Sequence, residues 1–135
     1  MLRRDYIQRM IEEFARVVAY AVGLKADGRN DEAVQELRNA YRTWFALDAD
    51  TIASLSPEEL VEKLSREENF PKEKMEALAD GLRTESELLS PADPLAADRC
   101  EQALALYRYL EKNDAATFSF PRKEAIRALE MRLQG

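Results

Sequence analysis

The fold of this chain is set by residues 3–47, which read RRDYIQRMIEEFARVVAYAVGLKADGRNDEAVQELRNAYRTWFAL. Apolar residues recur here at spacings of three and four, the period of one face of an α-helix. They are Ile7, Met10, Ile11, Phe14, Val18, Ala21 and Val22, followed by Ala33, Val34, Leu37, Ala40, Tyr41, Trp44 and Phe45. Gly28 separates the two runs and leaves room only for a tight reversal. We therefore expect an antiparallel helical hairpin over residues 3–47.

The first helix of this hairpin has an apolar face wider than one partner helix needs. Tyr6, Val17, Tyr20 and Leu24 extend the stripe sideways. We therefore expect neighbours on more than one side and a central place in the fold. Asn30 or Asp31 is predicted to cap the second helix.

Two further helical pairs are predicted downstream. Ser56 and Glu59 have the spacing of a capping box, with Pro57 at the first helical position, so a helix is expected to start there. Pro71 opens the next helix, in which Gly81 favours a kink or a close helix crossing. After a break at Ser90–Pro94, two more helices follow. The sequence thus predicts an acidic middle pair over 56–90 and a C-terminal pair over 94–134.

Composition agrees with one all-α domain over residues 1–135. The chain has 46% hydrophobic and 34% charged residues, with only five prolines and four glycines, which is typical of packed amphipathic helices. Its length is sufficient for a sizeable core. We expect about six helices in three consecutive antiparallel pairs.

Catalytic and metal-binding residue types are scarce. Histidine is absent, which removes the commonest general base and a frequent metal ligand. Residues 48–51 match the Asp-x-Asp-x-Thr loop of haloacid-dehalogenase-type phosphatases, but a helix precedes them where that chemistry needs a buried strand. We interpret them as an Asp cap on a short turn. Cys100 lies on an apolar stripe and is expected to be a small core residue. The sequence therefore predicts no enzyme activity, no cofactor and no metal site.

The net charge of −6 opposes general attraction to nucleic acid or to an anionic membrane, so neither partner is expected. The acidity is concentrated in residues 48–93, which carry 5 basic and 13 acidic side chains. This segment is either a solvated face or a docking surface for a basic peptide or helix. The chain shows no secretory leader and no apolar run of membrane-spanning length, so we expect a cytoplasmic protein.

Four aromatic side chains are candidates for contact with a partner: Tyr20, Tyr41, Trp44 and Tyr109. Aromatic residues commonly anchor protein interfaces. At helical spacing they also serve as core residues, and this alternative stays open for Tyr41 and Trp44. Tyr109 is a better surface candidate than Tyr107 on the same predicted helix, because Tyr107 shares its helix face with apolar residues.

The hairpin resembles a tetratricopeptide repeat over about one repeat length. Gly28 and Ala33 have the spacing of that family's turn glycine and packing alanine, with Leu37 and Ala40 at the next apolar positions. Val17 replaces the bulky first-helix residue of the family, and the expected proline after the second helix is missing. The resemblance implies a helical array, whose peptide groove would be lined by Ala15, Val18, Val22 and Lys25.

The C-terminal part resembles an uncharacterised family of small helical bacterial proteins. The residues that carry this resemblance are 103–110, ALALYRYL, together with Thr117–Phe120 and Arg122. It implies no known activity.

The sequence as a whole predicts a non-enzymatic helical module that binds an unidentified protein or peptide, or forms a homodimer. The alternative is a small-ligand sensor with an apolar pocket between the helices that start at Pro71 and Pro94. Gly81 and the break at Ser90–Pro94 favour this alternative.

Overall fold

The computed structural model describes residues 2–67, 70–113 and 119–134. This part of the chain consists of seven α-helices and contains no strand. They are α1 (Leu2–Ala26), α2 (Asn30–Phe45), α3 (Ala49–Ala53), α4 (Pro57–Arg66), α5 (Lys72–Leu88), α6 (Pro94–Asn113) and α7 (Phe120–Gln134). The predicted all-α class is confirmed. None of the helices described here is both long enough and apolar enough to cross a membrane.

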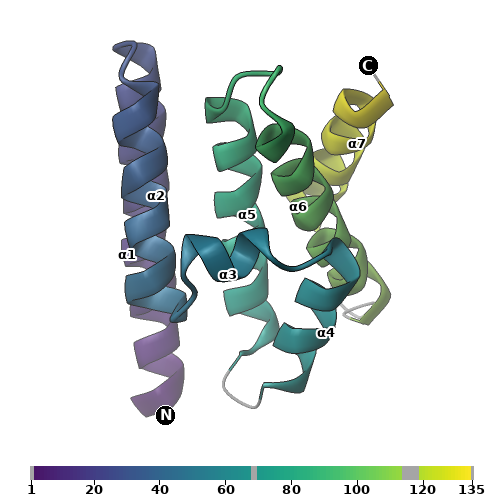
Figure 1. Ribbon diagram of the computed structural model, residues 1–135. Helices are drawn as coiled ribbons and strands as arrows, with labels where there is room; N and C mark the ends of the chain where they lie inside the picture. The colour runs from purple at the N-terminus through teal and green to yellow at the C-terminus, as the bar shows by residue number, and fades with distance from the viewer. Residues whose placement is uncertain (1, 68–69, 114–118, 135) are drawn as a thin grey trace.

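The helices form a row with α5 and α6 in the middle (Figure 1). The α1–α2 pair lies at one end of the row and α7 at the other, while α3 crosses in front and α4 lies below it. Helix α5 packs against α1, α2 and α6, and α6 packs against α4, α5 and α7. The core therefore runs along these two helices.

The predicted hairpin of α1 and α2 is confirmed. Gly28 adopts a φ of 76°, in the left-handed region that glycine enters without a steric penalty. The amides of Gly28 and Arg29 donate to the carbonyls of Lys25 and Leu24, at 2.9 and 2.8 Å. These bonds satisfy the last carbonyls of α1 and reverse the chain.

The central place predicted for α1 is wrong. Its principal contacts are with α2 and α5. Met10 and Phe14 are buried, but Tyr6 and Tyr20 remain 65% and 55% exposed. Helix α5 occupies the centre instead, because three of its sides meet other helices and its small residues Ala77, Ala79 and Gly81 permit close approach.

The middle helices do not form the predicted pair. Helix α4 packs mainly against α6, and α5 packs against α1, α2 and α6. The ten residues of α4 bury only Leu60 and Leu64 as full core residues, a face that suits one neighbour. The segment predicted as a capped turn forms the short helix α3, which buries Ile52. Its Asp48 makes no side-chain cap and instead accepts a hydrogen bond from Arg42 at 2.9 Å.

The predicted caps agree in part with the structure. Ser56 and Glu59 form the reciprocal capping box of α4, with N···O distances of 2.8 and 3.1 Å. At the predicted break before α6, the Asp93 side chain accepts from the Leu95 amide at 3.0 Å. The cap predicted for α2 is wrong, because Asn30 is already helical and its side-chain amide donates to the Leu88 carbonyl at the end of α5.

Gly81 marks a close helix crossing, one of the two alternatives, with a kink, that the sequence leaves open. A Cβ atom at this position would lie 2.6 Å from the Phe14 ring and 3.1 Å from the Tyr41 ring. Phe14 also packs edge-on against Phe45, with ring centroids 4.8 Å apart. The missing side chain therefore lets α5 approach the aromatic side chains of both α1 and α2.

Candidate functional site

A groove with a cavity volume of about 350 Å³ runs between α1 and α5, two helices that point in the same direction in Figure 1. We call it the α1–α5 groove. Its lining residues are Gln8, Ile11, Phe14, Ala15 and Val18 from α1, and Glu73, Glu76, Ala77 and Asp80 from α5. Phe14, which packs closely on Gly81 of α5, is the buried residue of the α1 lining.

The α1 side of the groove is uncharged and, apart from Gln8, apolar. Ile11, Ala15 and Val18 follow one another at spacings of four and three, so they lie along one line of the helix. Val22 continues this line and is 51% exposed. Three residues expected to line a peptide groove, Ala15, Val18 and Val22, thus share this line, and the structure places the first two in the lining.

The α5 side of the groove is acidic. Glu73, Glu76 and Asp80 are spaced three and four residues apart and therefore share one helix face. Glu76 pairs with Arg122 of α7 at 3.2 Å. The Asp80 carboxylate accepts a hydrogen bond from the Tyr107 hydroxyl of α6.

Asp80 is the titratable group of the groove with a raised pKa. Partial burial of the carboxyl group raises its pKa to about 6, although the hydrogen bond from Tyr107 acts in the opposite direction. Asp80 as a residue still counts as exposed to solvent. Its carboxylate therefore lies at the edge of the groove, reached by water yet partly enclosed by Tyr107.

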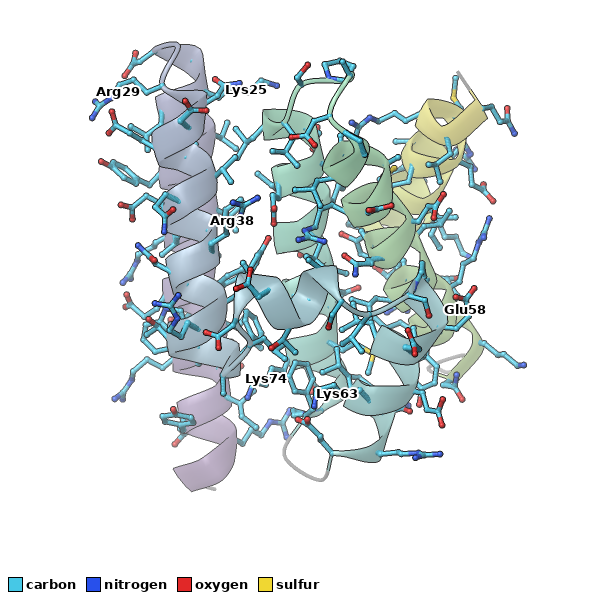
Figure 2. All side chains as sticks on the ribbon, viewed as in Figure 1. Lys25, Arg29, Arg38, Glu58, Lys63 and Lys74 are labelled. Carbon is cyan, nitrogen blue, oxygen red and sulfur yellow. The ribbon has the colours of Figure 1, made fainter. Side chains whose placement is uncertain are left out.

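A buried polar cluster holds α5 to its neighbours. Glu85 is fully buried and accepts from the Tyr41 hydroxyl at 2.8 Å, from Arg99 at 3.2 Å and from Arg38 at 3.3 Å. Arg99 also donates to Gln102 at 2.9 Å, and Gln102 donates to the Ile52 carbonyl of α3 at 2.8 Å. Figure 2 shows Arg38 pointing from α2 toward α5. This cluster ties α2, α3, α5 and α6 together and so fixes the position of the acidic face of α5.

The four aromatic candidates do not come together in one site. Tyr41 is 1% exposed, and burial followed by the neighbouring Glu85 charge raises the pKa of its hydroxyl. It is a core residue in this structure. Tyr20 is exposed on the outer side of α1, while Trp44 is half-buried against the core. Tyr109 is also half-buried and lies on α6.

Tyr109 lines a shallow surface between α4 and α6. This hollow has a volume of about 480 Å³ and is lined by Glu58, Val61, Glu62, Ser65, Ala105, Arg108, Tyr109 and Lys112. Figure 2 shows Glu58 on the outer side of α4. The acidic residues Glu58 and Glu62 come from α4 and the basic residues Arg108 and Lys112 from α6, so this surface has no single electrostatic preference.

Two observations concern metal ligands and the single cysteine. Across residues 2–67, 70–113 and 119–134, no group of three or more acidic, cysteine or histidine side chains is arranged to hold a metal ion. Cys100 is buried, and that burial raises the pKa of its thiol, which disfavours the nucleophilic thiolate.

No protein-family model, curated protein or solved structure matches this chain. Function is therefore inferred from the groove and its surroundings.

The acidic face of α5 was not singled out from the sequence. Its signal was available, because Glu73, Glu76 and Asp80 have helical spacing within the segment of highest acidic excess. The sequence does not indicate which helix lies beside this face. Nothing local indicates that the apolar line of α1 lies beside this face, because the two segments are far apart in the chain.

Proposed function

We propose that this protein is a non-enzymatic helical module that binds a protein partner in the α1–α5 groove. The observation that carries the proposal is the open groove itself, with an apolar line on α1 and an acidic line on α5. An amphipathic helix laid into a groove is a common mode of peptide recognition, with anchors at helical spacing. The cytoplasmic location predicted from the sequence is part of this proposal.

A blocked groove tests the proposal directly. Ala15 is exposed and lines the groove, so Ala15→Tyr fills it without disturbing the core. Ala97→Tyr is the matched control, since Ala97 is an exposed alanine on α6 away from the groove. Peptides selected on the wild-type protein from a displayed random library should bind the control and lose at least tenfold in affinity on Ala15→Tyr. Selected peptides that bind both variants equally would place the binding site elsewhere and refute the proposal.

A homodimer is the second candidate, and it is favoured by the exposed outer face of α1. Tyr6 and Tyr20 lie on this face and are large, apolar and solvent-exposed. The test is sedimentation equilibrium of the wild type and of Tyr6→Glu with Tyr20→Glu, in which a dimer through this face would become a monomer. Met10 is unsuitable as a probe, because it is 2% exposed and its replacement by Asp would damage the core.

A small-ligand sensor remains the alternative from a different functional class. The groove volume of about 350 Å³ falls within the range of about 300–1,000 Å³ of small-molecule sites. The groove lies between α1 and α5, whereas the sequence predicts a pocket between α5 and α6. A metabolite that raises the melting temperature of the wild type and not of Ala15→Tyr would favour this alternative over a peptide.

A further inference from the structure

We propose that the occupant of the α1–α5 groove is a basic amphipathic helix, with apolar side chains on α1 and lysine or arginine side chains along α5. This inference rests on the proposed function and adds the chemical class of the partner. It follows from the two unlike sides of the groove, from the spacing of its carboxylates and from the way these carboxylates are paired.

The carboxylates form a ladder with a helical repeat. The steps from Glu73 to Glu76 and from Glu76 to Asp80 correspond to rises of about 4.5 and 6 Å along α5. A second helix lying along the groove repeats its side chains at the same intervals. Basic residues at positions i, i+3 or i+4, and i+7 of such a helix would therefore each face a carboxylate.

These carboxylates are only partly neutralised by the protein itself. Glu76 pairs with Arg122, but Glu73 has no ion pair with any side chain that the structure describes. Asp80 accepts a hydrogen bond from the Tyr107 hydroxyl, which is neutral. The positive charge of Arg83 lowers the pKa of Asp80, but Arg83 also pairs loosely with Glu87 at 3.9 Å. The α1 side contributes no charge to the lining. A cationic partner is therefore complementary, and an acidic partner would be repelled.

The apolar side distinguishes a helix from a small polycation. The lining residues Ile11, Ala15 and Val18 cover two helical turns, about 10 Å, and the exposed Val22 continues this line beyond the lining. A polyamine would use only the carboxylates and leave this line in water. A helix with one apolar and one basic face would cover both sides at once.

Three fluorescent peptides of equal length test the inference. They share one leucine face and carry lysine, glutamine or glutamate at the flanking positions. We expect the lysine peptide to bind the wild-type protein at least tenfold more tightly than the glutamine peptide, and the glutamate peptide to bind weakest. This preference should shrink as the salt concentration rises, because the charges lie at a solvent-exposed rim.

The matching protein variant is Glu73→Gln with Asp80→Asn. Both substitutions keep side-chain size, and the amide oxygen introduced by Asp80→Asn can still accept from Tyr107, so the melting curve should show an intact fold. We expect a loss of about tenfold in affinity for the lysine peptide and little change for the glutamine peptide. The control is Glu36→Gln with Glu101→Gln, which removes the same net charge from exposed positions on α2 and α6 and should change neither affinity.

The outcomes separate this inference from the proposed function. If the glutamine or glutamate peptide binds as tightly as the lysine peptide and Ala15→Tyr blocks it, the groove binds a helix but not a basic one. If spermine displaces the lysine peptide at equal concentration, the carboxylates bind a polyamine and the helix is refuted. If no peptide binds in a manner that Ala15→Tyr abolishes, both proposals fail.

Discussion

At the scale of single residues, Glu85 is the least replaceable polar side chain in the core. It is fully buried on α5 and is paired with Arg99, whose side chain is 2% exposed. A buried ion pair adds little net stability compared with apolar residues of the same shape, but a buried charge without its partner is costly. Glu85 and Arg99 should therefore behave as one unit.

We expect Arg99→Met to lower the free energy of unfolding by about 3–5 kcal/mol, because Glu85 then keeps only Arg38 and Tyr41 as partners. The double variant Arg99→Met with Glu85→Gln should recover much of this loss. The matched control is Arg108→Met on the same helix, whose partner Glu130 lies 2.6 Å away but is 43% exposed, and it should cost less than about 1 kcal/mol. Urea denaturation of all variants measures these values, and equal losses for Arg99→Met and Arg108→Met would contradict the coupling of Glu85 to Arg99.

Asp80 makes stability depend on pH in a defined window. Its pKa rises from 3.8 to about 6 on folding, so the folded state binds more protons than the unfolded state between about pH 4 and pH 6. The contribution of Asp80 to the free energy of unfolding therefore falls as the pH rises through that window and is constant above it. Because Asp80 is an exposed residue, we expect it to contribute only about 1 kcal/mol to the free energy of unfolding, well below the free energy that the full pKa shift would give. The difference between wild type and Asp80→Asn in urea denaturation at pH 4 to pH 7 isolates this contribution.

The Tyr107 hydroxyl should control this pKa. Its hydrogen bond stabilises the ionised Asp80 carboxylate, so Tyr107→Phe should raise the pKa of Asp80 above about 6. Carboxyl ¹³C chemical shifts followed over a pH titration measure the change. A pKa that falls in Tyr107→Phe would mean that the hydroxyl does not donate to this carboxylate.

At the scale of helices, glycine has opposite effects in α5 and α1. A Cβ atom added at Gly81 would lie 2.6 Å from the Phe14 ring, whereas a Cβ atom added at Gly23 would meet no neighbouring atom within 4 Å. In Gly23→Ala the gain in helix propensity should stabilise the protein by about 1 kcal/mol. In Gly81→Ala the added methyl group should overpack the aromatic contact and cost about 1–3 kcal/mol. Thermal melting of the two variants checks both signs, and stabilisation by Gly81→Ala would show that Phe14 moves aside freely.

Helix bounds could be predicted from the sequence because their causes are local. The capping box at Ser56 and the reversal at Gly28 depend on residues a few positions apart, and both are found in the structure. The cap of α2 failed because Asn30 bonds instead to Leu88, a residue far along the chain. Helix α3 was missed because its five residues are too short to show a helical period.

At the scale of the whole molecule, pairing between helices was the least predictable feature. Neighbours in sequence were expected to pair, but α4 packs against α6 because α5 already meets α1, α2 and α6. The groove has the same origin, since it combines an apolar line on α1 with an acidic line on α5. Each line could be read in the sequence, but their proximity depends on long-range packing around Gly81 and Glu85.

The same arrangement predicts that α7 unfolds locally before the rest. Its main packing partner is α6, whereas α5 packs against three helices, so α7 is held by fewer packed neighbours. Helix α7 reaches α5 through Arg122, which pairs with Glu76, and through Arg132, which donates to Ser86. Leu129 on α7 and Leu78 on α5 are both fully buried, and replacing either with alanine removes about 2–5 kcal/mol of packing. In Leu78→Ala we expect faster amide hydrogen exchange in every helix, because the global stability falls. In Leu129→Ala the increase should be confined to α7, with exchange in α5 nearly unchanged. Uniform acceleration in Leu129→Ala would mean that α7 opens only together with the core, and its ion pairs from Arg122 to Glu76 and Glu111 would then stabilise the whole molecule.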